Sequence, residues 1–160
     1  MHELAQVNVA RMRGALDSPQ MQGFLTALDP VYRMAEASSG FVWRLRDGHG
    51  HAAVTRVDGS SLLVVNVSVW ASYEQLHAFV YRSQHGGFVR RRTRWFLPTT
   101  QPSTALWWVP AGERPTAEEA LDRLAFLRSH GPTPRAFSVR RRFDDAGRPV
   151  RRASAGISRA

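Results

Sequence analysis

Hydrophobic and polar residues alternate in two long segments of the chain, and this pattern predicts two β-strands. The segment LAQVNVARM (4–12) places Val7 and Val9 on one face and Gln6 and Asn8 on the other. The segment LLVVNVSVW (62–70) follows the same design, with valines on one face and an asparagine and a serine on the other. A period of two residues is typical of a strand whose two faces meet different surroundings. Less regular apolar patterns predict further strands at 41–46, 52–57, 104–111 and, at a sheet edge, 137–143.

Between the strands, apolar residues recur at the spacing of amphipathic helices. The first helix begins at Ser18, a good N-cap residue followed by proline. Asp29-Pro30 predicts a kink or a second helix, and the segment ends before Gly40. Another helix begins near Ser72, and the last begins at TAEE (116–119), which has the spacing of a capping box.

The predicted order of elements is β-α-β-β-α-β with an extra C-terminal helix. This is the order of a ferredoxin-like α+β fold, an antiparallel sheet with helices on one face. In that topology the first and third strands are central neighbours, so Asn8, Asn66 and Ser68 share one face of the sheet. Such a face is either solvated or the wall of a cleft. We favour the cleft, because the tryptophans of the flanking strands would be costly to leave in water.

The segment YRSQHGGFVRRRTRWF (81–96) predicts two short helices rather than one. On a helical wheel, the apolar residues before Gly86-Gly87 and those after it point in directions about 150° apart, so one straight helix could not bury both sets. His85 then ends the first helix. It is either a helix-terminal histidine that suits the macrodipole or a group beside the cleft that transfers a proton or binds a metal. Spacing alone favours the first interpretation.

The arginines of this segment do not form a basic stripe. Arg90 and Arg94 point away from the apolar cluster, whereas Arg92 falls within it and would need an acidic partner. The triplet RRR occurs at 90–92 and 140–142, but the signatures of the common nucleic-acid-binding folds are absent. Nucleic acid is therefore not the expected partner.

Composition adds limits of other kinds. The 160 residues fit one domain, the N-terminal segment does not resemble a secretory signal, and no apolar run is long enough to cross a membrane. The lack of cysteine excludes disulfides and thiolate metal sites and fits a cytoplasmic protein. The net charge is +9, and residues 140–160 hold 7 arginines against 2 acids. We therefore expect a folded domain over 1–139 and a basic, flexible tail over 140–160.

Three long segments resemble a bacterial family of domains of unknown function, numbered 3291. They are LAQVNVARM to FVWRLR (4–46), VVNVSVW to RTRWF (64–96) and LWWVPAG to TPRAF (106–137), so that the resemblance covers about 1–140. The family is grouped with dimeric α+β barrels similar to antibiotic-biosynthesis monooxygenases. The resemblance implies a homodimer of two ferredoxin-like subunits packed sheet to sheet. It also implies a cavity, and in several haem-binding relatives a helix histidine beside that cavity, as at His85, ligates iron.

Three hypotheses for function follow. The first is a small-molecule enzyme of secondary metabolism, monooxygenase-like or isomerase/cyclase-like, that needs no cofactor; Asn66 and Asn8 would orient a carbonyl or enolate and His85 would move a proton. The second is a haem protein with His85 as the axial ligand. The third is a non-catalytic module that binds a hydrophobic ligand. The residues expected to line the cavity are Trp43, Ser68, Trp70, Tyr81, Arg92, Trp95, Trp107 and Trp108.

Overall fold

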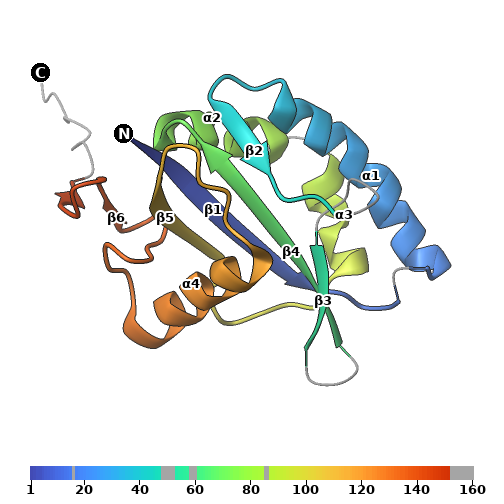
Figure 1. Ribbon diagram of the computed structural model, residues 1–160. Helices are drawn as coiled ribbons and strands as arrows, with labels where there is room; N and C mark the ends of the chain where they lie inside the picture. The colour runs from blue at the N-terminus through green and yellow to red at the C-terminus, as the bar shows by residue number, and fades with distance from the viewer. Residues whose placement is uncertain (16, 48–52, 58–60, 85–86, 152–160) are drawn as a thin grey trace, which may run out of the picture.

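The computed structural model describes residues 1–15, 17–47, 53–57, 61–84 and 87–151 (Figure 1). Its elements follow the predicted order, with β3 in the position of the weakly predicted strand. They are β1 (His2–Arg11), α1 (Pro19–Glu36), β2 (Phe41–Arg44), β3 (Ala53–Val57), β4 (Ser61–Trp70), α2 (Tyr73–Gln84), α3 (Gly87–Trp95), β5 (Thr104–Pro110), α4 (Ala117–His130), β6 (Arg142–Phe143) and β7 (Pro149–Val150).

The main sheet is antiparallel and has the strand order β2-β4-β1-β5. The first half of β4 pairs with β3 and the second half with β2, so these two short strands occupy the same edge. The two long strands β1 and β4 lie side by side in the centre, as the alternation predicted. This is the ferredoxin-like order, and the predicted fold class is confirmed.

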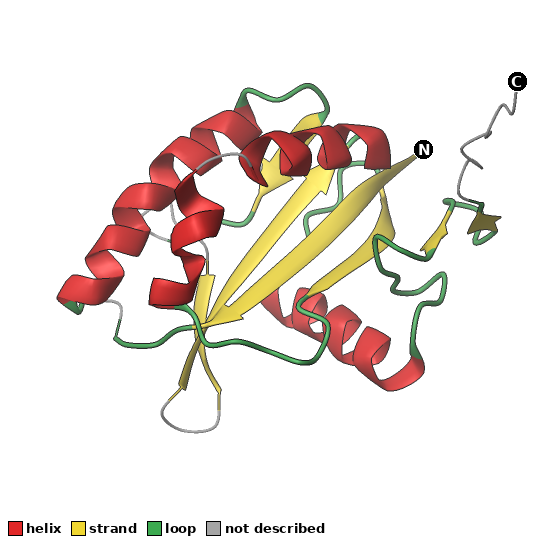
Figure 2. Ribbon diagram, turned by 180° about the vertical axis from the view of Figure 1, so that it is seen from behind, coloured by secondary structure: helices red, strands yellow, loops and turns green. Residues whose placement is uncertain are grey.

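Helices cover both faces of the sheet. Helices α1, α2 and α3 lie on one face, and α4 lies alone on the other (Figures 1 and 2). On the α4 face, the valines of β1 and β4 and Trp107 of β5 pack against Leu124 and Leu127 of α4. The apolar face predicted for each central strand is therefore buried within a single chain.

The opposite face has an apolar cluster at each end. One cluster centres on Phe24, Trp95 and Phe96, close to the C-terminal end of β1. The other centres on Leu4 and Trp70, close to the N-terminal end of β1. The middle of this face, between the clusters, carries the polar side chains of β1 and β4.

The helix boundaries match most of the predicted signals. Ser18 caps α1, and the reciprocal capping box of Thr116 and Glu119 is present at the start of α4. The predicted second helix at Pro30 was wrong, because α1 runs through this residue. Pro30 is exposed, so the carbonyl group that it leaves unpaired can be solvated. In the described part of the chain, no helix is both long and apolar enough to span a bilayer.

The predicted break between two helices is confirmed. Helix α2 ends at Gln84 and α3 begins at Gly87, so one helix ends and another begins where the helical wheel placed the change of phase. His85 itself, together with Gly86, lies outside the described residues.

The described chain after α4, up to residue 151, packs against the edge of the sheet. Phe137 forms a bridge with Leu106 of β5, through backbone hydrogen bonds of 2.8 Å in both directions. Residues 142–150 then form the β6–β7 hairpin, and Phe143 is buried in the cluster around Trp70. The predicted edge strand at 137–143 is therefore reduced to one bridge followed by a hairpin.

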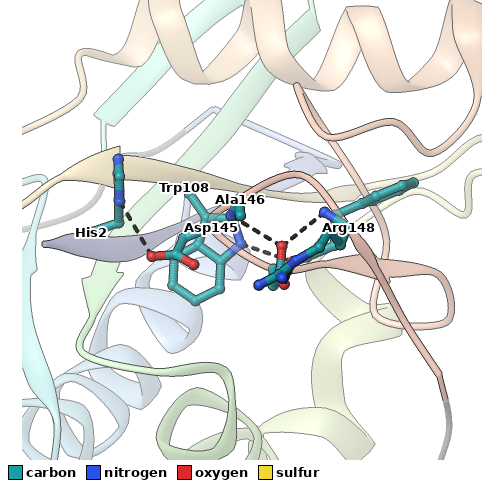
Figure 3. A network of polar contacts seen from close by, with 7 residues as sticks. His2, Trp108, Asp145, Ala146 and Arg148 are labelled. Carbon is teal, nitrogen blue, oxygen red and sulfur yellow. Dashed lines mark hydrogen bonds and ion pairs between the residues drawn. The ribbon is translucent and has the colours of Figure 1, made fainter.

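Side-chain contacts hold this hairpin in place (Figure 3). The Trp108 indole Nε1 donates a hydrogen bond to the Phe143 carbonyl at 2.8 Å, and His2 Nδ1 lies 3.4 Å from a carboxylate oxygen of Asp145. Within the turn, a hydrogen bond from the Arg148 amide, assisted by the Arg148 guanidinium, lowers the pKa of Asp144. The prediction of a flexible tail from residue 140 is therefore wrong for 140–151, since apolar contacts and hydrogen bonds fix this segment.

Candidate functional site

Polar side chains gather in the middle of the sheet face that α1, α2 and α3 cover. Gln6, Asn8, Asn66, Ser68 and Thr104, together called the polar patch, come from the adjacent strands β1, β4 and β5. All five are half-buried, and the fully buried side chains of the described chain include no polar one. Solvent therefore reaches the centre of the sheet on the side that carries three helices.

The strand register brings the two asparagines together. Asn8 is directly opposite Asn66 on β4 and directly opposite Thr104 on β5. Side chains directly opposite each other in an antiparallel pair have Cβ atoms about 4.5–5.5 Å apart. One ligand atom above the β1–β4 pair can therefore be reached by both amides.

Hydrogen bonds distinguish the members of the polar patch. Asn8 Nδ2 donates to Thr104 Oγ1 at 2.8 Å, which fixes the orientation of that amide. The Ser68 hydroxyl accepts a hydrogen bond from Trp70 Nε1 at 2.9 Å. The Asn66 amide makes no hydrogen bond with any other residue that the structure describes. Asn66 thus offers two donors and an acceptor to a ligand, and Asn8 one further donor.

Aromatic residues form the apolar surroundings of the polar patch. Trp70 is fully buried, stacks on Phe79 with ring centroids 5.1 Å apart and meets the edge of Phe41 at 5.4 Å. At the other end of the face, Trp95 packs against Phe24 at 5.7 Å. These rings hold the helices against the sheet at the two ends of the polar patch, whose five side chains stay partly exposed.

Residues 3–153 match the family model described as a domain of unknown function, DUF3291. The protein belongs to the DUF3291 family. The match confirms the resemblance seen in the sequence and extends it beyond residue 140, through the β6–β7 hairpin.

Comparison with solved structures adds two similar proteins. SnoaB, a cofactor-independent oxygenase from Streptomyces nogalater, aligns with 15% identity over 71% of this chain and 97% of its own, with a TM-score of 0.40. NE2512, a protein of unknown function from Nitrosomonas europaea, aligns with 14% identity over 72% of this chain and 97% of its own, also at 0.40. A comparison with functionally curated proteins finds no significant match. Likeness at this level does not assign an activity.

The structure of the DUF3291 protein places some predicted cavity residues elsewhere. Trp43 and Trp107 pack on the α4 face of the sheet, away from the polar patch. A β-bulge between Phe41 and Trp43 turns Trp43 to that face, since residues two apart in a regular strand would share a side. Trp108 is on the patch side, but its indole N–H is already bonded to the C-terminal hairpin.

Two predicted contacts on the helices are also corrected. Tyr81 is 61% exposed on α2, and Arg92 is exposed on α3 rather than enclosed by apolar neighbours. A guanidinium on a long stem can leave an apolar cluster for water, which avoids the cost of burying its charge. The helical wheel gave the direction of the Cβ atom but not the position of the charged end.

One member of the polar patch was missed by the sequence analysis. Thr104 opens β5 and is the hydrogen-bond partner of Asn8. Its position could be found only by fixing the register between β1 and β5, for which the apolar pattern of the short segment 104–111 leaves several choices.

Ser68→Ala is expected to lower the free energy of unfolding by about 1–3 kcal/mol, because it leaves the buried Trp70 indole N–H without its acceptor. Urea denaturation of the variant measures this loss. Ser68→Thr keeps a hydroxyl at the same position and serves as the matched control. A loss of similar size in both variants would show that the hydroxyl contact is not the cause.

Proposed function

We propose that this DUF3291 protein is a small-molecule enzyme that binds a flat, mainly apolar substrate against the polar patch and stabilises its enolate or phenolate form. The observation that carries the proposal is the pair of half-buried asparagines facing each other on the two central strands, with the Asn66 amide unengaged among the described residues. Two amide groups on adjacent strands, both within reach of one oxygen, form an arrangement suited to a developing negative charge.

The surroundings of the pair favour an apolar guest. Apolar clusters flank the polar patch at both ends, and no acidic residue belongs to the patch. A substrate ring can therefore lie beside aromatic walls while its oxygen reaches the amides. A few convergent polar groups in an otherwise apolar site orient the ligand, and the bound ring itself displaces water from the anion.

Anion stabilisation is compatible with two reaction classes. When a substrate loses a proton to give an electron-rich anion, that anion either reacts with dioxygen or rearranges. The first course is monooxygenase-like and the second is isomerase-like or cyclase-like. The proton acceptor predicted from the sequence is His85, which lies outside the described residues, so its part in the proposal rests on the sequence.

A haem-dependent activity depends on the same histidine. In the described part of the chain, no histidine belongs to the polar patch, and no group of three or more potential metal ligands occurs. His85 would have to supply the axial ligand, and the described arrangement around the patch offers no second observation that favours it. We propose the cofactor-free form because the asparagine pair supports it directly. A Soret band in the purified protein that is lost in His85→Ala would replace it with the haem hypothesis.

Asn66→Leu is expected to reduce the ability of the protein to stabilise a bound phenolate. The probe is alizarin, a flat dihydroxyanthraquinone whose phenol and phenolate forms differ in visible absorption. We expect the intact protein to lower the apparent pKa of the bound dye. Asn66→Leu should remove about one pH unit or more of that shift, because a hydrogen bond to a charged group contributes about 1.5–3 kcal/mol.

Two further variants sharpen this experiment. Asn66→Asp places a carboxylate beside the phenolate and should raise the apparent pKa of the dye above its value with Asn66→Leu. Thr26→Val changes an exposed hydroxyl on α1 and should leave the titration as in the intact protein. An intact protein that binds the dye without lowering its pKa, or an Asn66→Leu titration identical to that of the intact protein, would refute the proposal.

A further inference from the structure

A second polar feature lies at the end of the sheet where β1 finishes. Here the chain forms an open groove of about 1320 Å³ between the end of β1, the last turn of α3, the connection 97–103 and the C-terminal half of α4. Apart from Thr104, its lining is separate from the polar patch. An inference about this groove therefore goes beyond the proposed function and does not depend on it.

Five arginines line the groove: Arg11, Arg13, Arg92, Arg128 and Arg140. They come from four parts of the chain that are far apart in sequence, and only the fold brings them together. None of the acidic residues that the structure describes lines the groove. The described lining of the groove therefore concentrates positive charge, whereas an ordinary basic surface carries acidic residues among the arginines.

Backbone carbonyl groups position two of these guanidinium groups. Arg13 Nε donates to the Thr93 carbonyl at 2.8 Å, and Arg128 Nε donates to the Pro102 carbonyl at 2.9 Å. Such bonds hold the guanidinium without neutralising it. Among the described residues, neither arginine forms an ion pair, and partial burial lowers the pKa of Arg128. A positive charge held near other positive charges is stabilised by an anionic ligand.

The connection between α3 and β5 supplies neutral donors to the same groove. Its sequence PTTQPS (98–103) places Thr99, Thr100 and Ser103 along the lining, and its two prolines restrict the backbone. Hydroxyl groups next to guanidinium groups are a common combination for binding phosphate oxygens. The groove thus offers charge and hydrogen-bond donors to one ligand.

We propose that this groove binds the oligophosphate group of a small molecule. Several arginines along one groove match several negative charges better than a single one, and the planar fork of arginine suits phosphate oxygens. A small molecule fits better than a nucleic acid, because the arginines line one concavity instead of following a stripe over the surface. Val9, Phe96 and Leu97 in the lining provide apolar contacts for the rest of the molecule.

Calorimetric titration with inorganic tripolyphosphate and with inorganic phosphate tests the proposal. We expect tripolyphosphate to bind at least about tenfold more tightly than phosphate, because it engages several arginines at once. Arg92→Glu/Arg140→Glu should weaken tripolyphosphate binding by about tenfold or more. These two residues are exposed and donate no side-chain hydrogen bond to another described residue, so their replacement spares the contacts made by Arg13 and Arg128.

The matched control is Arg33→Glu/Arg151→Glu, which changes the net charge equally at two exposed residues that do not line the groove. This variant should change tripolyphosphate binding by less than about threefold, since distant surface charges are screened by salt. Thermal melts establish that both variants are folded, and Arg92→Gln/Arg140→Gln replaces the groove variant if the glutamates prevent folding. Equal losses in the groove and control variants would overturn the proposal.

A second titration distinguishes a small-molecule ligand of the groove from a nucleic acid. A single-stranded oligonucleotide is titrated at the same salt concentration as tripolyphosphate. Weaker binding of the oligonucleotide than of tripolyphosphate, per mole of phosphate, supports the proposed ligand class. Tighter binding that is lost in the groove variant would overturn it in favour of a nucleic-acid partner, and failure of tripolyphosphate to bind the intact protein would overturn the site itself.

Discussion

Trp107→Ala is expected to lower the free energy of unfolding by about 3–5 kcal/mol, the range for removing a large aromatic side chain from a packed core. Trp107 is 1% exposed and lies on the sheet face covered by α4, where it packs among the valines of β1 and β4. The variant leaves a cavity between the sheet and a single helix. Urea denaturation followed by far-ultraviolet circular dichroism measures the loss.

Trp43→Ala is the matched control. It removes the same side chain from the same face, but from an edge strand where Trp43 is only partly buried. Its cost should be clearly smaller, because less apolar surface leaves water when this residue folds. Equal costs for the two variants would mean that α4 does not cover the centre of this face in solution.

The same denaturation curves bear on the predicted homodimer. A dimer formed sheet to sheet would have to approach a face that α4 already covers, with partly buried residues such as Val42 and Leu45 near its edge. Dimerisation stays a prediction from the family resemblance. Denaturation midpoints that rise with protein concentration would support it, because association stabilises the folded chain. Midpoints independent of concentration would contradict it.

The parts of the fold that the sequence predicted are those governed by a short, regular period. The alternation in β1 and β4 assigned both faces correctly, because successive side chains of a strand point to opposite sides. The cap at Ser18 and the break before Gly87 were found for a similar reason, since each depends on residues close together in the chain. The central asparagine pair followed once the strand order was known.

The sequence-based predictions failed where the packing of distant segments determines the position of a side chain. The bulge in β2 reverses the side on which Trp43 lies, and no local pattern announces it. Thr104 joins the patch only through the register of β5 against β1. The arginine groove is assembled from four separate parts of the chain, so runs of arginine in the sequence did not reveal it.

The prediction of a flexible C-terminal segment rested on its basic composition. The contacts that hold this segment to the sheet depend on only a few residues, which the composition does not reveal. Phe143 is the large apolar residue of the β6–β7 hairpin that enters the core, and the Phe143 carbonyl accepts the Trp108 indole bond. A charge-rich composition predicts solvation on average. Here the buried Phe143 ring and the Trp108 hydrogen bond hold the segment against the sheet. Figure 3 shows Trp108 and the polar contacts around the turn.

Phe143→Ala is therefore expected to lower the free energy of unfolding by about 3–5 kcal/mol, as for other buried phenylalanines. Phe143 is 8% exposed and meets Phe137 with ring centroids 6.0 Å apart. Val150→Ala, in the same hairpin but at a side chain 41% exposed, should cost less than about 1 kcal/mol and is the matched control. Thermal and urea denaturation measure both variants. If residues 140–151 were a flexible tail, neither substitution would change the stability. A Phe143→Ala protein as stable as the intact one would therefore support the flexible-tail prediction.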